Sequence, residues 1–109
     1  LASSAASDVY KRQETIRAKR YFPAWVVDED SELVQGAMKG LKDAGIEAKL
    51  SHFAFCTNGS SFCGEAGIPC IGYGPSLESL AHVRDEYIEI DQLTKACKGF
   101  ECILAQLTK

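Results

Sequence analysis

The chain has 109 residues, of which 46% are hydrophobic and 25% are charged, and these values are ordinary for one small soluble globular domain. Its formal net charge of −3 argues against a nucleic-acid partner, because a surface that binds phosphate is basic. No apolar stretch approaches the roughly 20 residues that cross a bilayer, so we expect no membrane partner either.

The first segment, residues 1–13, is small and polar and has no periodic apolar face. It lacks the basic region followed by an apolar core that marks a secretory signal, and its end, residues 8–13, resembles translated adapter sequence. We therefore expect residues 1–13 to be an unstructured, non-native leader, with residues 14–109 forming the domain.

Three segments have the composition of β-strands. Residues 21–27 (YFPAWVV) are aromatic and β-branched, and residues 47–55 (EAKLSHFAF) alternate along the chain. Residues 68–73 (IPCIGY) form a short apolar run that ends where Gly74 and Pro75 break the pattern. Each of the three segments is therefore predicted to be a strand.

The clearest helix is predicted for residues 31–44, where apolar residues recur at helical spacing. Asp30 or Ser31 can cap its N-terminus, and Gly45 can supply a left-handed cap at its C-terminus. The acidic residues 28–30 suit the positive end of this helix better than they suit a metal site.

Two further helices complete the order of elements. Residues 60–67 favour a short helix with a serine cap, and a closing helix is expected from about Asp91. The apolar stripe of the closing helix consists of Leu93, Ala96, Cys97, Phe100, Ile103, Leu104 and Leu107. The order strand, helix, strand, short helix, strand, loop, helix indicates an α/β fold.

Five cysteines cannot all pair within one chain, and they contain no CxxC motif. They are Cys56, Cys63, Cys70, Cys97 and Cys102. We expect free thiols that act as small buried hydrophobes in a reducing, cytoplasmic environment. Two alternatives stay open: a structural zinc site of Cys63, Cys70 and His82, although this spacing matches no zinc finger, and a Cys–His hydrolase that uses Cys63 at a helix start.

His82 is the strongest chemical candidate that the residues alone provide. It follows a predicted strand and its loop, and loops at the carboxyl ends of strands bind ligands in open α/β sheets. A histidine there can ligate a metal or transfer a proton, and Asp85 and Glu86 are close enough in sequence to join or orient it. The alternative is a non-catalytic α/β interaction module with a structural His82.

A family resemblance gives these patterns a common meaning. Residues 64–93 (GEAGIPCIGYGPSLESLAHVRDEYIEIDQL) resemble the closing segment of the dinuclear-metal amidohydrolases and metallopeptidases of the acetylornithine deacetylase, succinyl-diaminopimelate desuccinylase, aminoacylase and carboxypeptidase type. The likeness covers roughly residues 20–107. Residues 21–25 and 55–59 are most similar to a subgroup of hydrolases assigned to selenium metabolism.

The resemblance implies the C-terminal part of a zinc-peptidase-like catalytic domain, with His82 as the last metal ligand. His82 would bind one of two zinc-type ions, with cobalt or manganese as alternatives, and Glu86 would support the histidine loop without ligating. The first metal histidine, the bridging aspartate and the catalytic glutamate are expected upstream of this chain. No residue here is therefore assigned a catalytic role, and the fragment alone is expected to be inactive.

The resemblance also implies a substrate site. Asn58 and Gly59 stand where relatives carry an acidic turn near the substrate, and the neutral amide of Asn58 puts an acidic role there in doubt. Gly74, Pro75 and Ser76 match a loop that lies against the carboxylate end of the substrate, with Ser76 in place of a glycine. The full-length parent would cleave an amide bond of a small molecule or short peptide, such as an N-acyl amino acid, with a metal-activated water. The resemblance is compatible with a homodimeric parent.

Overall fold

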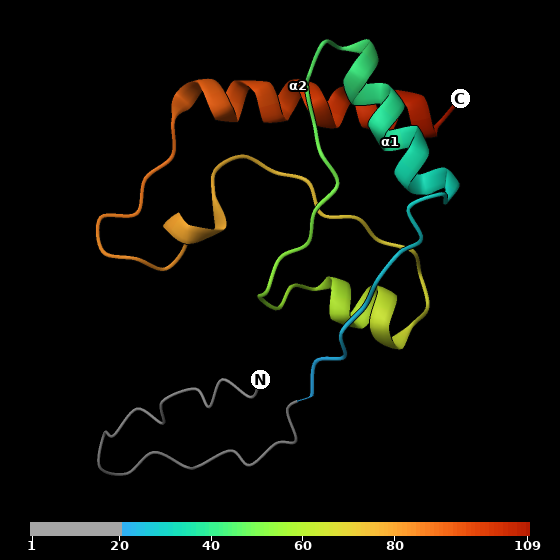
Figure 1. Cartoon of the computed structure of the whole chain (residues 1–109), viewed down its shortest axis with the longest axis horizontal. Helices are drawn as coiled ribbons and strands as arrows, with labels where there is room; N and C mark the ends of the chain where they lie inside the picture. Colours follow the sequence, from blue (N-terminus) through green and yellow to red (C-terminus); the bar gives the residue numbers. More distant parts are fainter. Residues whose placement is uncertain (1–20) are drawn as a thin grey trace.

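The computed structural model describes residues 21–109 as helices joined by extended chain (Figure 1). The predicted leader, residues 1–13, lies outside the described residues. The elements in chain order are the α-helix α1 (Glu32–Asp43), the π-helical turn η1 (Ser60–Glu65), the 3-10 turn η2 (Glu78–Leu80) and the α-helix α2 (Ile90–Leu107).

Residues 21–109 contain no β-strand, so the prediction of an α/β fold is wrong. The three predicted strands, residues 21–27, 47–55 and 68–73, are non-helical but form no ladder with one another. A strand exists only through hydrogen bonds to a neighbouring strand, and apolar or alternating composition does not supply that neighbour. In the second of these segments the backbone N–H of Ala54 instead donates to the Glu78 carboxylate at 3.0 Å.

The helix α1 forms where the sequence predicts it, and both of its caps are local. The hydroxyl oxygen of Ser31 accepts a hydrogen bond from the backbone N–H of Val34 at 3.4 Å. At the other end Gly45 has a φ of 72°, which allows the Ile46 N–H to donate to the Leu41 carbonyl at 2.9 Å. This is a Schellman closure, and it turns the chain sharply away from the helix.

The core lies between α1 and α2, which pack across one another (Figure 1). Its buried hydrophobic side chains are Val34, Ala37, Leu41, Ala96 and Ile103. The two helices approach closely at Gly40, where an added Cβ would lie 2.6 Å from the carbonyl oxygen of Cys102. Ile71 and Tyr73 pack against this core from one of the extended segments.

Only part of the apolar stripe predicted for α2 is buried. Ala96 and Ile103 face the core, whereas the stripe's exposed members are Leu93, Cys97, Phe100, Leu104 and Leu107. Among the described residues, exposed large hydrophobic side chains outnumber buried ones. The closing helix is therefore confirmed, but α1 covers only one side of its apolar surface.

The cysteines are free, as expected, but none of them is buried. Cys56 and Cys97 are exposed, and the other three are half-buried. The core is small and contains none of the five cysteines, although Cys97 and Cys102 lie on α2 itself, so the expectation of buried thiols is wrong. No helix among residues 21–109 is both long and apolar enough to cross a membrane.

Candidate functional site

The loop between η2 and α2 holds His82 in an exposed, left-handed conformation. His82 and Asp85 both have φ values of 58°, a region that side chains other than glycine rarely adopt. The backbone N–H of His82 donates to Oε2 of Glu86 at 3.2 Å, which closes the loop. The imidazole itself has no hydrogen-bond partner within residues 21–109, so both of its nitrogens are free to meet a ligand.

The described residues do not form a complete metal site. Across residues 21–109, no three side chains of His, Cys, Asp or Glu come together in a way that could hold a metal ion. A catalytic zinc ion takes three protein ligands, so His82 can supply one ligand of a site that needs others. The alternative zinc site of Cys63, Cys70 and His82 is not formed.

The predicted substrate turn, Asn58-Gly59, leads directly into η1. The hydroxyl oxygen of Thr57 accepts from the Gly59 N–H at 3.1 Å, and the Asn58 carbonyl accepts from the N–H groups of Ser61 and Phe62, each at 3.1 Å. The short helix is therefore confirmed. The prediction that a serine caps this helix is wrong, because Gly59 occupies the cap position and no side chain caps the helix.

The same turn lines an open hollow of about 440 Å³. We call it the aromatic hollow, because its walls include Trp25, Phe53, Phe62, Tyr73 and Phe100. Two aromatic pairs within it meet edge to face, Trp25 with Phe53 at 6.2 Å between ring centroids and Tyr73 with Phe100 at 5.0 Å. None of the residues that line it carries a charge.

The predicted carboxylate loop, Gly74-Pro75-Ser76, lies outside the aromatic hollow. Ser76 has a φ of 74°, and its N–H donates to Oε1 of Gln92 at 2.7 Å, which ties the loop to the first turn of α2. His82 does not line the hollow either. Of the predicted site residues, only Asn58 and Gly59 therefore line the aromatic hollow.

Replacing Ser76 with glycine should raise the free energy of unfolding by about 0.5–1 kcal/mol, because glycine adopts this left-handed φ without steric cost. The matched control is Ser79→Gly, since Ser79 lies in η2 and has no positive φ. That change should be neutral or destabilising. Urea unfolding of both variants measures the difference, and an equal loss of stability in the two would show that Ser76 is not strained.

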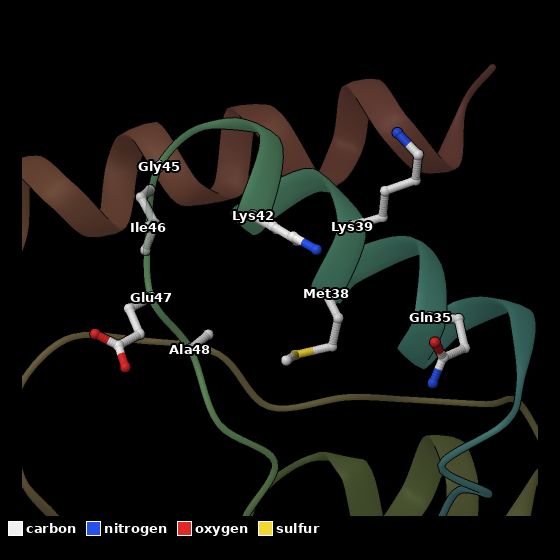
Figure 2. Close-up of a pocket in the computed structure, with 8 residues that line it drawn as sticks. All are labelled: Gln35, Met38, Lys39, Lys42, Gly45, Ile46, Glu47 and Ala48. Carbon is white, nitrogen blue, oxygen red and sulfur yellow. The ribbon is translucent and has the colours of Figure 1, made fainter.

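A second hollow, of about 590 Å³, lies beside α1, and sequence reasoning did not find it (Figure 2). Gly45 turns the chain back along the helix, so that Met38 extends toward Ala48 across the opening (Figure 2). Lys39 lines this hollow, and the hydrogen bond from its ammonium lowers the pKa of the Asp43 carboxyl. The left-handed Gly45 is the sequence signal for this hollow, but none of the predicted site residues lies in it.

The sequence matches one protein-family model and several known proteins. The model of Peptidase family M20/M25/M40 matches residues 11–106. The chain is 39% identical over 67 residues to the uncharacterized protein YgeY of Escherichia coli K12. These 67 residues make up 61% of this chain and 17% of that protein. It is 26% identical over 87 residues to a Pyrococcus horikoshii protein provisionally named as a LysW-lysine/LysW-ornithine hydrolase. These 87 residues make up 80% of this chain and 27% of that protein.

The chain thus spans less than a third of the length of the curated relatives that it matches. No solved structure gives a significant match. The family match extends over most of the sequence and includes residues 64–93, which carried the resemblance. The expected family is confirmed: the chain belongs to peptidase family M20/M25/M40.

Proposed function

We propose that the chain is part of a metal-dependent hydrolase that cleaves an amide bond in a peptide or an N-acyl amino acid. The observation that carries this proposal is the family match over residues 11–106. A hydrolase name in the Pyrococcus horikoshii relative supports the same reaction class. The five free cysteines support a cytoplasmic location.

In this proposal His82 is one metal ligand and Glu86 is a positioning residue. Three properties of the loop support these roles: the exposed imidazole, the hydrogen bond from the His82 N–H to Glu86, and the left-handed backbone at His82. Strained backbone of this kind often accompanies functional sites. A divalent metal, zinc in the first instance, would lower the pKa of a bound water so that it attacks the amide carbonyl.

The substrate-facing residues are proposed to be Asn58 and Gly59 in one turn and Gly74, Pro75 and Ser76 in another. The position of the first turn at the rim of the aromatic hollow supports its role. The second turn would use backbone N–H groups, but that of Ser76 is already bonded to Gln92. We therefore expect the substrate to be a small molecule or short peptide that contacts mainly the first turn.

The isolated 109-residue chain should hydrolyse N-acetyl amino acids and dipeptides no faster than buffer, even with zinc added. The reason is that residues 21–109 bring no three metal ligands together. Amine release is the measurement, with the full-length protein as the positive control. The full-length activity should disappear in chelator and return with zinc. Turnover by the isolated chain would contradict this assignment, as would full-length activity that chelator leaves unchanged.

A further inference from the structure

We propose that the aromatic hollow is a specificity pocket for an uncharged apolar or aromatic side chain of the substrate. This inference rests on the proposed function and adds a substrate class to it. It names N-acyl amino acids and short peptides with side chains such as those of phenylalanine or leucine. Acidic and basic side chains are excluded.

The size and lining of the hollow support this ligand class. Its volume of about 440 Å³ lies within the range of about 300–1,000 Å³ that is usual for small-molecule sites. Such sites combine mostly apolar walls with a few polar groups that orient the ligand. Because no lining residue is charged, a charged side chain would lose its hydration without gaining a partner.

The polar edge of the hollow can orient the amide group next to that side chain. The Asn58 side chain is exposed and has no hydrogen-bond partner within residues 21–109, so its amide can both donate and accept. The neighbouring Thr57 hydroxyl already accepts from the Gly59 N–H. Asn58 is therefore the lining side chain best placed to meet a peptide-like group.

Gly59 keeps this edge next to the aromatic wall. A Cβ added at Gly59 would overlap the ring of Trp25, so only glycine allows the turn to lie against that ring. The side chain of Trp25 is half-buried at this contact. A ligand in the hollow would consequently change the surroundings of the indole.

Trp25 provides the measurement, since it is the only tryptophan in the chain. The full-length protein and its Trp25→Phe variant are titrated in chelator with N-acetyl-L-phenylalanine, N-acetyl-L-lysine and N-acetyl-L-glutamate, which differ only in their side chains. The difference between the two fluorescence responses isolates that of Trp25. We expect a saturable change in tryptophan fluorescence with N-acetyl-L-phenylalanine. Binding of the two charged compounds should be at least about tenfold weaker. A response that does not saturate, or equal affinity for all three compounds, would overturn the proposal.

Three variants locate the binding. Asn58→Asp introduces a negative charge at the rim, so the affinity for N-acetyl-L-lysine should rise about tenfold and that for N-acetyl-L-glutamate should fall. Phe62→Ala removes part of the wall and should weaken N-acetyl-L-phenylalanine binding about tenfold. Phe22→Ala is the matched control, because Phe22 is as exposed as Phe62, each at 53%, but does not line the hollow. Equal effects of the two phenylalanine changes would place the binding elsewhere.

This titration needs neither a metal ion nor turnover, so its failure differs from failure of the proposed function. If the full-length protein hydrolyses amides but the hollow binds none of the compounds, the pocket assignment is wrong and the hydrolase assignment stands. If the compounds bind with the predicted preference but the full-length protein shows no hydrolysis, the pocket assignment stands and the hydrolase assignment is wrong.

Discussion

Replacing His82 with alanine in the full-length protein should lower kcat/KM for amide hydrolysis by about a thousandfold or more. A catalytic metal site has few protein ligands, and removal of one weakens the metal and misplaces the water that it activates. The fold should be preserved, because the His82 side chain is exposed and its loop is closed through its backbone N–H. Steady-state kinetics at saturating zinc measure the effect.

His52→Ala is the matched control, since His52 is the only other histidine and is also exposed. This variant should retain wild-type kinetics. Activity that survives His82→Ala within a few-fold of wild type would remove the metal-ligand assignment. His82 would then be structural, and the metal ligands would lie elsewhere in the protein. Absence of hydrolysis in the wild-type protein itself would instead favour a non-catalytic interaction module.

Replacing Gly40 with alanine should lower the free energy of unfolding by about 2–3 kcal/mol, although alanine favours a helix by about 1 kcal/mol. The added Cβ would lie 2.6 Å from the carbonyl oxygen of Cys102 and 3.1 Å from its carbonyl carbon. These are backbone atoms of α2, so they cannot rotate aside as a side chain would. The helices must instead move apart, which loosens the packing of Leu41 and Ile103.

Gly36→Ala is the control for this prediction, because Gly36 lies in the same helix, α1. A Cβ there would meet Cδ2 of Leu107 at 2.6 Å, and this flexible side chain can adopt another rotamer. The change should therefore be neutral or stabilising by up to about 1 kcal/mol. Urea unfolding followed by circular dichroism compares the two variants. Similar stabilities would contradict the close approach of α1 and α2 at Gly40.

Features that depend on local sequence were predicted correctly. The helix α1 follows from apolar spacing, and its ends follow from Ser31 and Gly45, whose caps involve residues no more than a few positions away. The short helix η1 and the closing helix α2 were also predicted from local sequence, although the serine cap predicted for η1 is wrong. The family followed from the motif in residues 64–93.

Features that depend on distant partners were not predictable in the same way. Residues 47–55 alternate as a strand would, but no other segment within residues 21–109 pairs with them. The stripe on α2 has the right period, yet the period does not reveal that only Ala96 and Ile103 of the stripe are buried. The aromatic hollow is lined by residues that lie between Trp25 and Ile103 in the chain, and no spacing in the sequence predicts that they come together.

The candidate site also contains parts that the sequence predicted and parts that it did not. The motif identified His82 and Glu86, which are four residues apart and joined by a local hydrogen bond. It also identified Asn58 and Gly59, but it gave no sign of the uncharged hollow beside them. The strain at Ser76 could be expected only in part, from the replacement of a glycine in the loop.

The metal content of the full-length protein tests the central claim most directly. Zinc bound per chain is measured after dialysis for the wild type, His82→Ala and His52→Ala. We predict about two ions in the wild type and in His52→Ala, and about one in His82→Ala, because each metal site depends on its few protein ligands. Equal zinc content in all three proteins would contradict the assignment of His82 as a metal ligand.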